Sequence, residues 1–137
     1  MDEISVLLVD DEREFLEVLT KRLRKRKLKL TTANSGEEAL RIIREVPVDV
    51  VVLDMKMPEM DGLQTLKEMK KSNPSVEVIM LTGHADVDSA VEGLELGAFD
   101  YLMKPVDIDE LLYKLQDAVK KRSISEPGPA TPGTDRA

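Results

Sequence analysis

Five polar residues stand at the ends of apolar segments, and together their side chains could do chemistry. Asp10 and Asp11 follow the first segment, Asp54 the third, Thr82 the fourth and Lys104 the fifth. If the segments are parallel strands, their carboxyl ends meet at one edge of a sheet, and the five side chains share one cleft. Each residue alone is more commonly a helix cap, a turn residue or a solvated lysine, whereas the set of five indicates a site.

Three carboxylates in one cleft need a cation. Without one they would repel one another and raise one another's pKa. The chain has one histidine and no cysteine, and carboxylate oxygens select a hard divalent ion such as Mg²⁺ over zinc. Because Mg²⁺ keeps open positions that phosphate oxygens can occupy, the cleft is predicted to bind a phosphoryl group.

Asp54 is the predicted nucleophile of this cleft. It follows the apolar residues 50–53, where burying an unpaired carboxylate would cost several kcal/mol. A carboxylate can attack phosphorus and form an acyl phosphate, while Lys104 and Thr82 bind the oxygens of the transferred group. The chain has no GxxxxGK[ST] motif, and no GxGxxG motif follows the first strand. The phosphoryl group is therefore expected to arrive on another protein or on a small acyl phosphate.

Strand and helix patterns alternate five times along the chain and would position these residues. The expected strands are residues 4–9, 28–33, 48–53, 76–81 and 99–103. Three helix starts carry capping pairs, namely Ser35 with Glu38, Asp61 with Gln64 and Asp107 with Glu110. In the fourth helix, Ala90, Val91 and Leu94 are expected on the apolar face. The alternation predicts an α/β fold, a doubly wound parallel sheet with helices on both faces.

The composition indicates one folded domain and a different C-terminal segment. The 137 residues fit one domain, which we expect over residues 1–122. Residues 123–137 are rich in Pro, Gly, Ser and Thr and are expected to form a disordered tail or linker. The formal net charge of −7 argues against nucleic-acid binding as the main activity. The apolar runs indicate neither a signal peptide nor a membrane span, so we expect a soluble cytoplasmic protein.

Four segments resemble the receiver domain of two-component response regulators. They are, in order, LLVDDE, DVVVLDMKMPEMDG, VIMLTGHAD and GAFDYLMKP. The resemblance covers residue 4 to about residue 120, and the order of all four motifs makes it specific. The last two segments look most like receivers that are attached to transcriptional activators.

The resemblance implies a flavodoxin-like fold with the strand order 2-1-3-4-5 and five flanking helices. It implies a phosphorylation-activated switch rather than an ordinary enzyme, in which Asp54 accepts a phosphoryl group from a sensor histidine kinase or a phosphotransfer protein. The changed surface would bind an effector protein or an output domain that is missing from this sequence. Direct contact with nucleic acid or a membrane is not implied, and the resemblance leaves room for a dimer that forms on phosphorylation.

The family's pattern also assigns a metal set, and the positions of Lys56 and His84, two residues after Asp54 and Thr82, predict a pair that times the loss of phosphate. Asp11, Asp54 and the backbone carbonyl of Lys56 would ligate Mg²⁺, and Asp10 would act through a water molecule. The side chains of Lys56 and His84 would flank the approach of the water that hydrolyses the acyl phosphate. A lysine across the phosphoryl group would hinder that water, so slow self-dephosphorylation is expected.

A switch pair and a cis peptide bond complete the pattern. Thr82 would move toward the phosphoryl group, and Tyr101 would turn inward into the space that Thr82 leaves. The bond between Lys104 and Pro105 would be cis and would aim the lysine into the cleft. About 5% of X-Pro bonds are cis in folded proteins, so this expectation comes from the resemblance.

Two other classes of protein could use a similar fold or a similar aspartate. A phosphohydrolase of the dehalogenase-like class is expected to carry a second acid two residues after the nucleophile, where this chain has Lys56. A flavin-binding module can share the fold, but flavin sites require aromatic stacking, and the chain has no tryptophan and few aromatic residues. Phosphorylation, rapid phosphate release or a yellow protein would distinguish the three classes.

Overall fold

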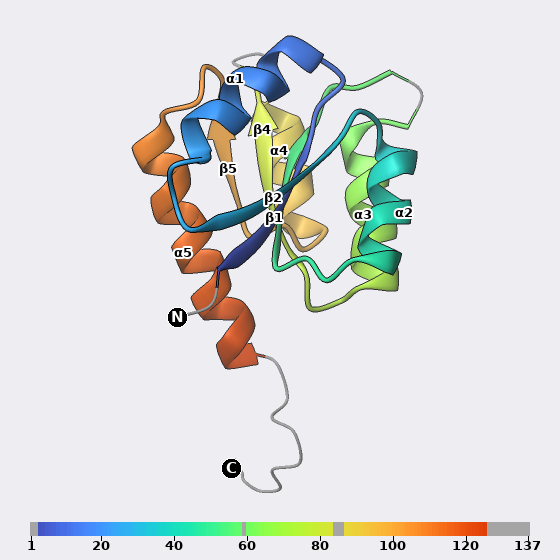
Figure 1. The fold of residues 1–137 in the computed structure, drawn as a ribbon. Coiled ribbons are helices and arrows are strands. Elements are labelled where there is room, and N and C mark those ends of the chain that lie inside the picture. Colours follow the sequence, from blue (N-terminus) through green and yellow to red (C-terminus); the bar gives the residue numbers. More distant parts are fainter. Residues whose placement is uncertain (1–2, 59, 84–86, 126–137) are drawn as a thin grey trace, which may run out of the picture.

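A computed structural model describes residues 3–58, 60–83 and 87–125 of the chain (Figure 1). Five parallel strands form one sheet in the order β2-β1-β3-β4-β5, which confirms the expected topology. The strands are β1 (Ile4–Val9), β2 (Leu28–Ala33), β3 (Val50–Asp54), β4 (Glu77–Thr82) and β5 (Asp100–Met103). The helices are α1 (Arg13–Leu23), α2 (Gly36–Glu45), α3 (Gly62–Ser72), α4 (Val87–Glu95) and α5 (Ile108–Ser125).

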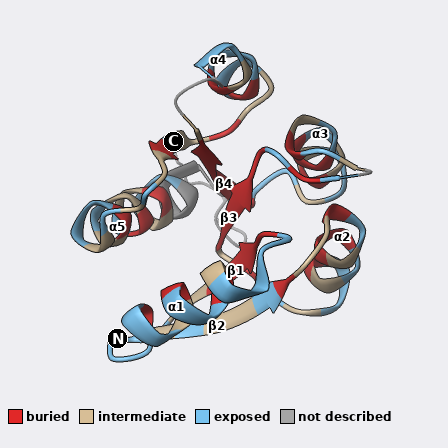
Figure 2. Ribbon diagram, turned by 90° about the horizontal axis from the view of Figure 1, so that it is seen from above, coloured by how far each residue is buried: buried red, intermediate tan, exposed pale blue. Residues whose placement is uncertain are grey.

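The helices cover both faces of the sheet because strand side chains alternate in direction (Figure 2). On β1, Val6 and Leu8 pack in a core cluster with residues of α1 and α5. Leu7 and Val9, the alternate residues, pack in a second cluster with residues of α2 and α3. The central strands β3 and β4 are buried along their whole length. Apolar residues on both faces explain why these strands read as continuous apolar runs.

The three expected capping pairs are confirmed at the helix starts. In each pair, a side-chain oxygen of the first residue accepts the backbone N–H of the residue three positions later, at 2.9–3.1 Å. Ser35 accepts from Glu38, Asp61 from Gln64 and Asp107 from Glu110. These bonds satisfy helix N–H groups that have no partner within the helix. The caps at Asp61 and Asp107 begin the helices that follow β3 and β5, so they help to fix the loops beside the carboxyl edge of the sheet.

The strand ends differ from the expectation by one or two residues. Asp54 and Thr82 are the last residues of β3 and β4, whereas the sequence pattern placed them just after the strands. Asp54 pairs with Leu81 in the parallel ladder, and the N–H of Met55 still donates to the carbonyl of Leu81 at 3.1 Å. Regular sheet pairing therefore continues through the polar residues and holds their backbone in place.

The expected apolar face of α4 is correct for Ala90 and wrong for two other residues. Ala90 is buried, but the side chains of Val91 and Leu94 are 52% and 40% exposed. The buried face is instead made by Ala90 and Gly93, and Gly93 packs closely on Met80 of β4. Small residues let the helix approach the sheet, so the larger apolar residues face outward. Val87, at 58% exposure, extends this uncovered side of α4.

Helix α5 continues to Ser125, three residues beyond the expected domain boundary at Arg122. The sequence has Pro127 two residues after this end, and the residue before a proline disfavours the helical conformation. The prediction of a disordered tail falls mainly on residues 126–137, which lie outside the described part of the chain. In the described part, no helix is long and apolar enough to cross a membrane.

Gly62 is expected to tolerate no side chain, because α3 begins against the backbone of β3. A Cβ atom at Gly62 would clash with the Cα atom of Met55 and would lie 3.0 Å from the carbonyl oxygen of Asp54. Gly62→Ala should lower the free energy of unfolding by about 1–3 kcal/mol, as measured by urea denaturation. In the control Gly93→Ala, the atoms nearest to the new Cβ are the ends of the Met80 and Leu66 side chains, which can move more easily than backbone. An equal loss in both variants would contradict this explanation.

Candidate functional site

The register of the sheet brings the predicted polar residues to one edge. Val9 pairs with Leu53, so Asp10 and Asp54 are the next residues on neighbouring strands. Across β4 and β5, Thr82 pairs with Met103, and the N–H of Lys104 donates to the carbonyl of Thr82 at 2.9 Å. The ends of β1, β3, β4 and β5, which are neighbours in the sheet, therefore form a continuous row.

Three carboxylates of this row lie close enough together to hold one ion. The side chains of Asp10, Asp11 and Asp54 each offer an oxygen atom within 4.8 Å of the others. Asp10 is fully buried, Asp54 is 5% exposed and Asp11 is exposed. An all-oxygen set that is open to solvent on one side fits a hydrated Mg²⁺ ion, which keeps several water ligands. The residues present thus fit the predicted ion.

The ammonium group of Lys104 lies among these carboxylates. Its Nζ atom is 2.8 Å from Asp10 Oδ2, 3.8 Å from Asp54 Oδ1 and 3.4 Å from Glu12 Oε1. The same atom lies 4.4 Å above the centre of the Phe15 ring, a cation–π contact. The peptide bond that follows, between Lys104 and Pro105, is cis.

Glu12 and Phe15 are site residues that the sequence reasoning missed. Phe15 is partly buried against the core cluster beneath α1 and α5, and the ammonium group of Lys104 lies over its ring. The position of Phe15 in the first turn of α1, four residues after Asp11, would have been the available signal. Glu12 could have been noticed because it continues the acidic run Asp10–Asp11.

Backbone N–H groups orient the two buried carboxylates. Asp54 Oδ1 accepts the N–H of Lys56 at 3.2 Å, and Asp10 Oδ1 accepts the N–H of Glu12 at 2.9 Å. In both cases the donor lies two residues further along the chain, in the loop that leaves the strand. Each loop therefore fixes the direction of the carboxylate that precedes it.

The pKa values show that negative charge is in excess at this edge. Burial raises the pKa of Asp54 to about 7, and the charge of Asp10 adds to the shift. Burial also acts to lower the pKa of Lys104, but its hydrogen bond to Asp10 and the charges of Asp54 and Asp10 outweigh that effect, so this pKa is raised. Both raised pKa values mean that the site favours bound protons, and a further cation would satisfy the same excess of negative charge.

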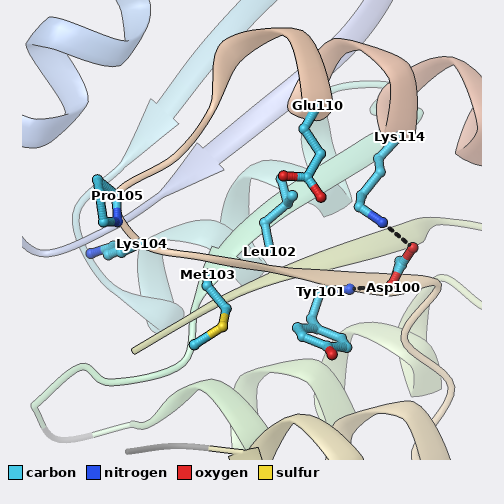
Figure 3. Close-up of a pocket in the computed structure, with 8 residues that line it drawn as sticks. All are labelled: Asp100, Tyr101, Leu102, Met103, Lys104, Pro105, Glu110 and Lys114. Atoms are coloured by element: carbon cyan, nitrogen blue, oxygen red, sulfur yellow. Dashed lines mark hydrogen bonds and ion pairs between the residues drawn. The ribbon is translucent and has the colours of Figure 1, made fainter. Parts of the chain in front are cut away.

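Strand β5, which directly precedes Lys104, lines a groove of about 490 Å³ together with α5 (Figure 3). Tyr101 and Met103 lie on the opposite side of the strand from Leu102, which packs in the core cluster beneath α5. Tyr101 is 40% exposed, so the ring is turned outward. Lys114 of α5 pairs with Asp100 at 2.6 Å and ties the helix to the start of the strand. The remaining predicted residue, His84, lies outside the described residues.

The family model of the response regulator receiver domain matches residues 6–116. The chain belongs to this family. All of the strand ends that form the row lie within the matched residues of the receiver domain.

The relatives of this receiver domain include longer regulators. The chain is 42% identical over 125 residues to the transcriptional regulatory protein ZraR of Klebsiella oxytoca, covering 91% of this chain and 28% of that protein. It is 40% identical over 121 residues to the regulatory protein AtoC of Escherichia coli K12, covering 88% of this chain and 26% of that protein. The chain thus spans little more than a quarter of the length of these relatives.

A solved structure of the same family has the same fold. The crystal structure of a response regulator receiver domain protein from Clostridium thermocellum superposes with a TM-score of 0.85 and 38% sequence identity. The match covers 88% of this chain and 98% of the other. This likeness agrees with the strand order and helix arrangement of the receiver domain described above.

The raised pKa of Asp54 predicts a pH-dependent cost of folding in metal-free protein. Because the folded pKa of about 7 exceeds the ordinary 3.8, the proton favours the folded state, and stability falls as the pH rises between these values. Asp54→Asn in EDTA should raise the melting temperature by roughly 5 °C or more at about pH 8 and have little effect below about pH 4. The control is Asp109→Asn at an exposed position of α5, which should change little at either pH. No gain at pH 8, or an equal gain at both values, would contradict the interpretation.

Proposed function

We propose that this receiver domain is a phosphorylation-activated signalling switch that accepts a phosphoryl group on Asp54. The observation that carries the proposal is the buried Asp54 carboxylate, within 4.8 Å of two further carboxylates and 3.8 Å from the ammonium of Lys104. The arrangement combines a nucleophile, a cation-binding oxygen set and a fixed positive charge. Family membership supports the same function.

The residues would divide the phosphoryl transfer as follows. A carboxylate oxygen of Asp54 attacks phosphorus, and the bond from phosphorus to the donor atom breaks as the new P–O bond forms. Lys104 and Thr82 bind the equatorial oxygens and hold the group in line. With acetyl phosphate as donor, acetate leaves with the bonding electrons, and no proton transfer is required.

Four residues of the chain would hold Mg²⁺. Asp11, Asp54 and the backbone carbonyl of Lys56 are the proposed ligands, and Asp10 acts through a water molecule. A bound Mg²⁺ would supply positive charge that offsets the negative charge of the transferring phosphoryl group. Asp10 also holds Lys104 at 2.8 Å, so this buried carboxylate serves both cations of the site.

The proposed phosphodonors are a sensor histidine kinase or a phosphotransfer protein in the cytoplasm. The chain would catalyse only its own phosphorylation and dephosphorylation.

The test is incubation with acetyl phosphate and Mg²⁺, followed by intact-mass measurement. A stable addition of one phosphoryl group is expected for the wild type, and none for Asp54→Asn or in EDTA. Rapid phosphate release without a lasting adduct would favour a phosphohydrolase, and an adduct on Asp54→Asn would show that the nucleophile is another residue.

The proposed output surface is formed by α4, β5 and α5. Val87, Val91 and Leu94 leave an apolar stripe uncovered on α4, and Tyr101 is exposed on β5. Phosphorylation would draw the Thr82 hydroxyl toward the phosphoryl group and let Tyr101 turn inward, which shifts the population between two states of this surface. An effector protein, an output domain of a longer chain or a second phosphorylated copy is the proposed partner.

Thr82→Ala should separate phosphorylation from the surface response. Without the hydroxyl, Asp54 still accepts the phosphoryl group, because the nucleophile and the ion-binding carboxylates are unchanged. The chemical-shift changes that phosphorylation causes on α4, β5 and α5 should fade in NMR spectra. Thr82→Ser, which keeps the hydroxyl, is the control and should respond like the wild type. An undiminished response in Thr82→Ala would refute the coupling.

Lys56→Asn should shorten the life of the phosphorylated state several-fold. The lysine side chain is exposed and follows Asp54 by two residues, where it can lie across the phosphoryl group and hinder the attacking water. Since only the backbone carbonyl of Lys56 is proposed as a metal ligand, the affinity for Mg²⁺ should barely change. The measurement is phosphate release from purified phosphoprotein. An unchanged or slower release would remove Lys56 from the timing mechanism; the second proposed timing residue, His84, can be tested by the same assay.

A further inference from the structure

Glu12 stands at the N-cap position of α1 but does not cap the helix. An N-cap side chain usually accepts an N–H from the first helical turn, and Glu12 makes no such bond. Its carboxylate instead reaches across the cleft, with Oε1 at 3.4 Å from the Nζ atom of Lys104. The side chain thus connects the start of α1 with the end of β5.

Lys104 does not depend on Glu12 for its position. Asp10 Oδ2 lies nearer to the ammonium, at 2.8 Å, and its side chain is buried, whereas the side chain of Glu12 is 66% exposed. The ring of Phe15 contacts the same ammonium from a third direction. Asp10 and Phe15 therefore hold the lysine, and the exposed Glu12 carboxylate can leave it for water at small cost.

We propose that Glu12 occupies the Lys104 ammonium in the resting site and thereby disfavours small anionic phosphodonors. This role rests on the proposed function of Asp54 as phosphoryl acceptor. The oxygens of an incoming phosphoryl group must take the place of the Glu12 carboxylate beside Lys104. The carboxylate also repels a donor that carries two negative charges. Glu12 acts through its contact with Lys104 and touches no reacting atom, and it neither gains nor loses a proton in the transfer.

The proposal predicts which kinetic parameter changes. In Glu12→Gln the side chain keeps its size and loses its charge, so a dianionic donor should be captured more readily. The ratio of maximal rate to half-saturating concentration for acetyl phosphate should rise roughly two- to five-fold at low salt. The rise should come from the half-saturating concentration, while the maximal rate stays within error, and it should shrink near 0.5 M salt.

Two comparisons separate this role from a general loss of negative charge. Glu14→Gln removes the same charge from an exposed position of α1, and no contact in the described part of the chain joins Glu14 to Lys104. This control should show less than half of the effect. Phosphoramidate, which carries one net negative charge near neutral pH and loses ammonia on transfer, should gain less from Glu12→Gln than acetyl phosphate does. An equal effect of both variants, or an unchanged or lower ratio in Glu12→Gln, would overturn the proposal.

A measurement without metal or donor tests the contact itself. In EDTA, the ¹⁵N-detected ammonium signal of Lys104 should shift in Glu12→Gln and remain in place in Glu14→Gln. An unmoved Lys104 signal in Glu12→Gln would overturn the proposal whatever the kinetics. If the wild type and both variants take up no phosphoryl group, the proposed function of Asp54 fails, and the role of Glu12 as a donor-discriminating residue fails with it. Phosphorylation of the wild type with no gain in Glu12→Gln refutes the role of Glu12 alone.

Discussion

The ion pair between Lys104 and the buried carboxylates at the carboxyl edge of the sheet is the interaction on which the site depends. Asp10 and Asp54 are almost fully buried, and unpaired charges there would cost far more than a surface ion pair returns. One ammonium at 2.8 Å and 3.8 Å offsets part of that cost, but Asp11 adds a third carboxylate. The site therefore retains excess negative charge, which a divalent ion can neutralise, and a bound cation would favour the ionised form of Asp54 that attack on phosphorus requires.

The fold supplies this charge arrangement through parallel pairing. Each strand ends at the same edge, and the ladder continues through Asp54 and Thr82, so the polar side chains start from a rigid backbone. The loops that follow are free to serve the site, as the N–H groups of Lys56 and Glu12 do for the two carboxylates. Apolar residues on both faces of β3 and β4 hold the sheet together, while the edge carries the polar chemistry.

Much of this could be read from the sequence, because local patterns specified it. The alternation of strands and helices, the three capping pairs and the approximate strand ends needed only neighbouring residues. The exposed face of α4 could not be predicted, because the close approach of Gly93 to Met80 depends on a contact between distant segments. The contacts of Glu12 and Phe15 with Lys104 were missed because neither residue ends a strand, and the meeting of strand ends at one edge was the pattern that predicted the other site residues.

The most direct test of the central claim is to locate the phosphoryl group chemically. Protein treated with acetyl phosphate and Mg²⁺ is reduced with borohydride, which converts an aspartyl phosphate into homoserine, and is then mapped by peptide mass spectrometry. The account predicts homoserine at position 54, dependent on Mg²⁺ and absent after treatment in EDTA. Homoserine at another position, or unmodified Asp54 in protein that carries the added phosphoryl mass, would contradict it.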